Sequence, residues 1–174
     1  MSSRLSVQAL LVLLLACTVS GQNLPSQHNH NVDTAGMIDG ETHPELIPDA
    51  TAYRLYMLTV STMPNATTDE HARQASHIAA LRLHNADRIT LTTILTDFKS
   101  RYSEMISEFN ASATAAIARG EAPDIKTFLQ KRNDLVQFVM TTLRLSLSPD
   151  GMKKLDSHIQ LQKRSMKVDE QEAQ

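Results

Sequence analysis

The chain has 174 residues and a formal net charge of −2, with no Trp, one Cys and only 4% aromatic residues. This near balance of charges argues against a nucleic-acid partner, which would require an excess of basic residues. A single Cys excludes an internal disulfide framework and a metal site built on several thiolates, so the fold must depend on apolar packing.

Residues 1–21 have the layout of a secretory signal peptide. An Arg precedes an unbroken apolar run over 9–17, and Val19 and Gly21 stand at the −3 and −1 positions before Gln22. The run is shorter than the roughly 20 residues that a transmembrane helix needs. We therefore expect export to the periplasm or the extracellular space, cleavage before Gln22, and no transmembrane segment in the mature chain.

The segment Leu14-Leu15-Ala16-Cys17 offers a second interpretation of this leader, because it resembles a bacterial lipobox. In that case Cys17 becomes the lipidated first residue and anchors a lipoprotein. Leu15 stands where a smaller residue is usual, and an ordinary cleavage site follows at once. We therefore favour the soluble form and keep the lipoprotein as the alternative.

Residues 22–48 predict a flexible, acidic N-terminal arm, since the stretch is rich in Pro, Gly, Asn and acidic residues and contains no Lys or Arg. Four of its side chains could supply oxygen and nitrogen donors to one ligand: Asp39, Glu41, His43 and Glu45. The alternative is structural, with Pro44 and Pro48 fixing an extended backbone and the neighbouring Leu and Ile pinning it to the helices. We favour the structural interpretation.

The histidines suggest a metal site, for which His28, His30 and His43 are the candidate ligands. His77 and His84 are seven residues apart and are expected on one helical face, about 10 Å from each other. That separation is too large for two imidazoles to share one ion. An extracytoplasmic metal- or ligand-binding protein that uses the His-bearing arm is therefore the alternative function.

Apolar residues recur at steps of three and four from residue 49 onward, which is typical of amphipathic helices. The first helix is expected to end before Pro64. Thr67-Thr68-Asp69-Glu70 fits a capping box that begins a second helix over 68–83.

The longest predicted helix follows residues 83–87 and ends near Gly120. Gly120 and Pro123 are typical of a helix end and a helix start, so the next helix should return antiparallel to the long one. The residues expected to interdigitate between the two helices are Phe98, Tyr102, Phe109, Phe128, Leu135 and Val139.

Ser148-Pro149-Asp150 predicts the start of a last helix, which leads to a frayed tail over 168–174. The predicted fold is an all-α, elongated antiparallel hairpin or bundle of about five helices. It forms a single domain over 49–167.

Residues 145–155 resemble the second copy of the Leu-Thr-Pro-Glu-Gln type (LTXXQ) motif in the periplasmic CpxP and Spy group of helical stress and chaperone proteins. Ser148, Asp150 and Gly151 stand where that motif has Thr, Glu and Gln. Residues 81–87 lie where the group has its first copy, ahead of the long helix, although they lack its Pro and Gln. The resemblance implies a helical hairpin, chaperone activity and envelope-stress sensing.

The sequence contains no nucleophile elbow and no glycine-rich phosphate loop, so we expect no catalytic residues, no cofactor and no enzyme. It predicts instead an exported, non-enzymatic interaction protein with a protein partner or client, and a homodimer is a further expectation. Flexible thioethers suit surfaces that accept varied partners. The methionines expected to contribute to such a surface are Met57, Met63, Met105, Met140, Met152 and Met166.

Overall fold

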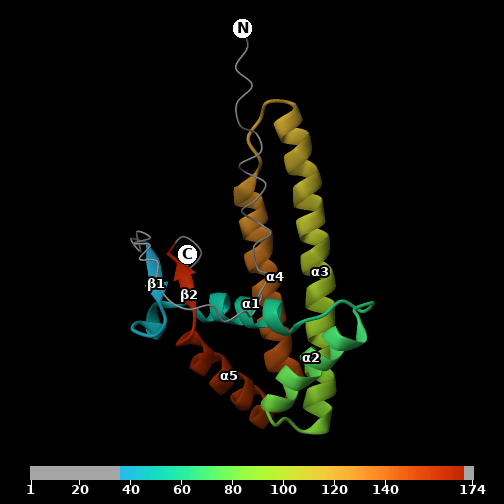
Figure 1. The fold of residues 1–174 in the computed structure, drawn as a ribbon, viewed down its shortest axis with the longest axis vertical. Helices are drawn as coiled ribbons and strands as arrows, with labels where there is room; N and C mark the ends of the chain where they lie inside the picture. Colours follow the sequence, from blue (N-terminus) through green and yellow to red (C-terminus); the bar gives the residue numbers. More distant parts are fainter. Residues whose placement is uncertain (1–35, 171–174) are drawn as a thin grey trace, which may run out of the picture. The chain divides into compact units, whose positions relative to one another are not determined.

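The computed structural model describes residues 36–170, and over this range the protein is an all-α helical bundle, as the sequence predicted. Figure 1 shows helices α3 and α4 side by side, with α1 crossing them and α2 and α5 near their lower ends. The elements, in chain order, are β1 (Met37–Asp39), the 3-10 helix η1 (Pro44–Leu46), α1 (Asp49–Val60), α2 (Thr68–Ala80), α3 (Asn85–Ala118), α4 (Ile125–Ser146), α5 (Pro149–Lys163) and β2 (Lys167–Asp169).

Several sequence-based predictions lie outside the described residues. These are the signal peptide, the lipidation site at Cys17, the first part of the arm, and His28 and His30. Within residues 36–170, no helix combines the length and the apolar character needed to cross a membrane.

Helix α2 begins at the predicted capping box. The Glu70 amide donates to Thr67 Oγ1 at 3.3 Å, and Glu70 Oε2 accepts from the Thr67 amide at 2.8 Å. The predicted end at residue 83 was wrong, since α2 stops at Ala80 and Arg82 turns the chain with φ of 52°. His84 therefore precedes α3, and it does not share a helix with His77.

The hairpin of α3 and α4 follows the prediction closely. Gly120 makes the turn with φ of 78°, a conformation that favours glycine, and the Asp124 carboxylate caps α4 by accepting from the Thr127 amide at 3.0 Å. Across the interface the ring centroids of Phe109 on α3 and Phe128 on α4 lie 4.5 Å apart, and along α3 those of Phe98 and Tyr102 lie 5.4 Å apart. Val139 is buried, and Leu135 is partly buried at the edge of the core.

The core lies where α1 meets the hairpin and α5. Most of its members come from α1, the first half of α3, the second half of α4 and the inner face of α5, and Ile78 of α2 and Val168 of β2 also belong to it. The largest fully buried side chains include Tyr53, Met57, Phe98, Leu143 and Leu155.

Two short strands join the ends of the described chain, which the sequence did not predict. β1 pairs with β2 in antiparallel register, with Ile38 opposite Val168, and Val168 is buried. A Cβ on Gly40 would lie 1.8 Å from the Lys163 carbonyl oxygen, so only glycine fits there. The arm is therefore structured from Met37, and the chain is paired through Asp169, where we had predicted a frayed end. Three-residue strands are too short for alternation to reveal them.

Candidate functional site

The α3–α4 hairpin extends beyond the other helices of the described chain. The core cluster uses α3 only as far as Tyr102 and α4 only from Leu135 onward. Figure 1 shows the upper ends of both helices running past α1 toward the turn that joins them. The distal half of the hairpin is therefore two helices packed on each other, without a third described helix to cover them.

An apolar stripe on each helix runs from the covered half into this distal half. A spacing of eleven residues is close to three helical turns, so such residues share a face. On α3, Leu95 is fully buried, whereas Ile106 and Ile117 are 36% and 39% exposed. On α4, Met140 is 3% exposed, whereas Leu129, eleven residues earlier, is 37% exposed.

A second apolar stripe on α4 also changes from buried to exposed along the helix. Val136 is 2% exposed, whereas Ile125, eleven residues earlier, is 54% exposed. We call the surface formed by Ile106, Ile117, Ile125 and Leu129 the distal face. Its residues continue the stripes that α1 covers lower on the hairpin. The distal face is therefore an extension of the core surface that the described chain leaves open.

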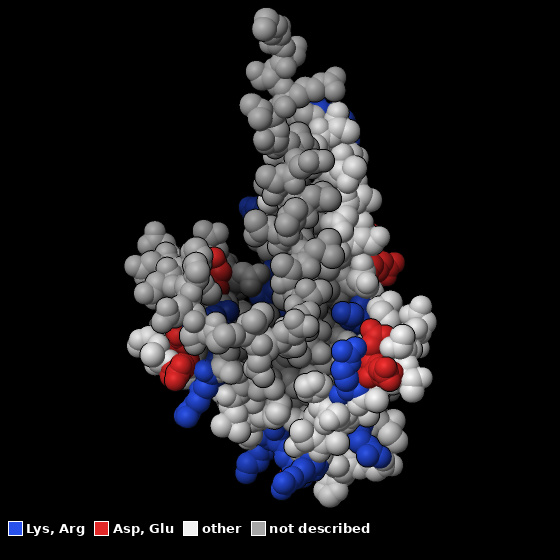
Figure 2. Space-filling view, viewed as in Figure 1, with Lys and Arg blue, Asp and Glu red and all other residues white. Residues whose placement is uncertain are grey.

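Polar residues and one lysine flank the distal face. By helical position, these are Ser103 and Asn110 on α3, and Lys126 and Asn133 on α4. Arg132 lies beneath it, 7% exposed, and donates to Asn133 Oδ1. Figure 2 shows the visible surface of distal α3 as largely white, while Lys and Arg gather over the lower end of the molecule.

The opposite side of the distal hairpin is charged. Glu108 and Lys131 form an ion pair at 3.6 Å, and Gln130 donates to Asp134 at 2.9 Å. A hollow of about 350 Å³ lies between the helices on this side, lined in part by Phe109 and Phe128. The distal hairpin is thus amphipathic, with charged residues on one side and exposed Ile and Leu on the other.

Residues 81–87 and 145–155 meet at one junction. Asp87, 5% exposed at the start of α3, accepts hydrogen bonds from the Ser148 amide at 2.8 Å and the Ser148 hydroxyl at 2.6 Å. Lys154 Nζ also donates to the Arg82 carbonyl oxygen at 3.1 Å. The junction fixes the start of α5 to the start of α3.

The candidate ligand residues of the arm do not converge. His43 Nδ1 pairs with Glu45 Oε1 at 3.1 Å on the surface, and Asp39 accepts from the Glu41 amide and lies 3.6 Å from Lys167. Among residues 36–170, no three His, Cys, Asp or Glu side chains are grouped closely enough to hold a metal ion. The proposed role of His28 and His30 stays a prediction.

The methionines do not form the expected surface. Met57, Met105 and Met140 are buried, which assigns them to packing inside the bundle. Met63, Met152 and Met166 are half-buried, and Met152 lines a cleft between α4 and α5. The sequence analysis missed the distal face, although the eleven-residue recurrence of apolar residues could have indicated it.

No protein-family model, no curated protein and no solved structure matches this chain.

Proposed function

We propose that this chain is an exported, non-enzymatic protein that holds apolar segments of other, incompletely folded proteins against its distal face. One observation carries the proposal. The apolar stripes that are 0–3% exposed beneath α1 become 36–54% exposed beyond it, at Ile106, Ile117, Ile125 and Leu129. Exposed apolar side chains that gather on one side of a molecule are typical of an interaction site.

The packing of α1 indicates what kind of segment the distal face accepts. α1 contacts both α3 and α4, and its buried side chains belong to the same core cluster as the two stripes. A client segment with one apolar side would continue this packing toward Gly120.

The resemblance to the CpxP and Spy group supports the same proposal. That group implies chaperone activity on a long helical hairpin, and here the two motif-like segments lie at the base of such a hairpin. Under this proposal the base fixes the hairpin in place, and its distal half holds the client.

The test is an aggregation assay with chemically reduced insulin as the client. We expect the wild-type protein to suppress light scattering in proportion to its concentration. The double variant Ile117→Ser with Leu129→Ser should lose most of that suppression, because it places two hydroxyl groups on the distal face and removes apolar contact area.

The matched control changes the opposite side of the same hairpin, with Glu108→Ser and Lys131→Ser. These two side chains are about 60% exposed and lie on the same two helices. The control variant should suppress scattering as well as the wild type. A wild-type protein without effect on the client, or equal suppression by the distal-face variant, would show that the distal face is not a client site.

A further inference from the structure

We propose that the cleft between α4 and α5 binds a small zwitterion, namely an α-amino acid or a short peptide with an apolar side chain. The cleft has a volume of about 480 Å³, which lies within the usual range for small-molecule sites. It is distinct from the distal face, and the proposal does not depend on client binding.

One face of α5 forms a wall of this cleft. Pro149, Met152, Lys153 and Asp156 recur at helical steps of three, one and three residues, and all of them line it. Leu147 and Arg144 line the α4 side. The lining therefore combines an apolar part, made by Leu147, Pro149 and Met152, with charged groups around it.

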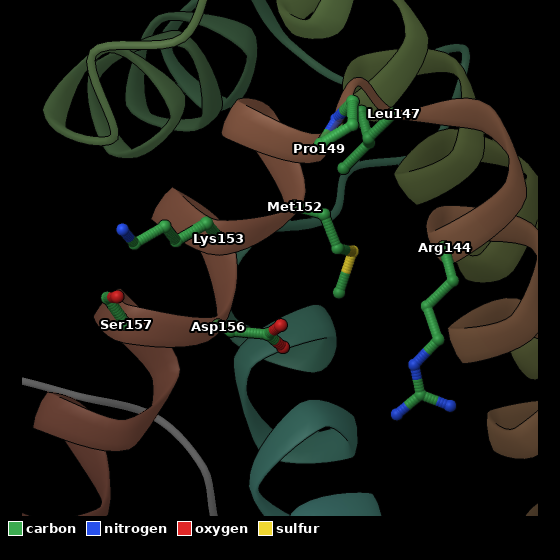
Figure 3. A pocket seen from close by; sticks show the side chains of 7 residues that line it. All are labelled: Arg144, Leu147, Pro149, Met152, Lys153, Asp156 and Ser157. Atoms are coloured by element: carbon green, nitrogen blue, oxygen red, sulfur yellow. The ribbon is translucent and has the colours of Figure 1, made fainter.

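Two opposite charges face the same space without pairing with each other. Figure 3 shows the Arg144 guanidinium and the Asp156 carboxylate directed into the gap between the helices, with the Met152 thioether between them. Among the described residues, no carboxylate lies within ion-pair distance of Arg144. The Arg144 side chain thus offers its planar set of N–H donors to a ligand carboxylate.

A hydrogen bond from α1 positions the Asp156 carboxylate. The Tyr53 hydroxyl donates to Asp156 Oδ1, and burial, together with this hydrogen bond, raises the pKa of Tyr53 above its ordinary value. The phenol therefore stays protonated and continues to donate. Asp156 Oδ2 has no other partner among the described residues, so it is free to accept from an ammonium group.

Charge complementarity selects the class of ligand. A simple anion would bind Arg144 but would be repelled by Asp156, and a simple cation would bind Asp156 but would be repelled by Arg144. Lys153 also lines the cleft, but Figure 3 shows its ammonium group directed away from the gap between these two side chains. A zwitterion satisfies both groups at once, with its carboxylate on Arg144 and its ammonium group on Asp156. Its apolar side chain would lie against Met152 and Leu147.

The experiment is isothermal titration calorimetry of the full chain with L-leucine and with L-leucyl-L-leucine. Saturable binding of either probe is expected, and the tighter of the two distinguishes a free amino acid from a peptide as the source of the zwitterion. Acetylation of the ammonium group or amidation of the carboxylate of the tighter probe should weaken binding about tenfold or more, since each change removes a charge-assisted contact.

Two variants assign these contacts to residues. Arg144→Gln should weaken binding of the zwitterion, and amidation of the probe's carboxylate should then cause no further loss of affinity. Asp156→Asn should likewise remove the loss of affinity that acetylation of the ammonium group causes. The Asp156→Asn change keeps an acceptor oxygen for the Tyr53 hydroxyl, and thermal melting checks that each variant is folded. The control variants are Arg101→Gln and Asp97→Asn, which remove the same charges from a surface ion pair on α3.

The control variants should bind like the wild type. Absence of saturable binding for both probes, or equal affinity for capped and uncapped forms, would overturn the proposal. An equal loss of binding affinity in the control variants would also overturn the proposal.

Discussion

Asp87 connects two helix starts that are far apart in the sequence. Its two carboxylate oxygens accept from the hydroxyl and the amide of Ser148, and these hydrogen bonds hold the pKa of Asp87 below its ordinary value. Ser148 in turn caps α5 by accepting from the Gly151 amide at 3.0 Å. A Cβ on Gly151 would lie 2.4 Å from Asp87 Oδ2, so a larger residue at this position would displace the carboxylate.

Replacing Asp87 should destabilise the protein in a pH-dependent way. A carboxyl whose pKa is lower in the folded state contributes stability above its unfolded pKa and loses it as the pH falls through the folded value. We expect Asp87→Ala to lower the melting temperature clearly at about pH 7. At about pH 2 the wild type and the variant should melt at closer temperatures, because the contribution of the wild-type carboxylate is lost as the pH falls from its unfolded pKa toward its folded pKa.

The control for this prediction is Asp150→Ala. Asp150 is 55% exposed and pairs with Lys154 on the surface, so its removal should change the melting temperature little at either pH. The role of Asp87 would be contradicted if Asp87→Ala lowered the melting temperature equally at both pH values, or no more than Asp150→Ala.

At the scale of the element, α4 presents buried and exposed leucines two residues apart. Leu143 is 1% exposed in the core, and Leu145 is 82% exposed. Removing a buried leucine side chain typically costs about 2 to 5 kcal/mol, whereas an exposed one contributes little. We expect Leu143→Ala to lower the free energy of unfolding by about that amount and Leu145→Ala to leave it nearly unchanged, as measured by urea denaturation.

Because both leucines lie in the last turns of one helix, a change in helix propensity affects the two variants equally. Similar losses in both variants would therefore contradict the packing of α4 against α1 and α3. The two side chains differ only in the direction in which the helix presents them.

At the scale of the whole molecule, the two halves of the α3–α4 hairpin differ in how much of their surface other helices cover. The half near α1 lies within the core, and the distal half has no third described helix packed on it. Local opening costs less where fewer buried contacts must be broken. We expect amide hydrogens of the distal half, over 106–117 and 125–131, to exchange with solvent sooner than those over 91–98 and 136–143. Hydrogen-exchange mass spectrometry measures this difference.

The same measurement tests the expected homodimer. If a second copy covers the distal face, the distal amides should be protected at high protein concentration and should lose protection on dilution. Fast distal exchange at every concentration would mean that no copy covers this face. Slow exchange at every concentration would contradict an open distal face.

Much of the fold was predictable because its determinants are local. The capping box at Thr67, the turn at Gly120 and the cap at Ser148 each depend on residues within one helical turn, and all three were confirmed. The end of α2 was predicted three residues too late, since nothing local in the sequence showed that Arg82 would adopt a positive φ.

The candidate sites were less predictable than the helices. Period and spacing identify an apolar stripe, but they do not show where another helix stops covering it, so Leu95 and Ile106 look alike in the sequence. The cleft between α4 and α5 was missed for a similar reason. Arg144 and Asp156 belong to different helices, and only the packing of those helices makes them face one space.

The sequence by itself determined the all-α class, the order of the helices and the antiparallel hairpin, because helical period, caps and turns are properties of neighbouring residues. Only the tertiary structure decided which apolar residues are buried, that Asp87 joins the starts of α3 and α5, that β1 pairs with β2, and which charges share a cleft. These features depend on contacts between residues far apart in the chain, and the same local pattern is compatible with many such contacts.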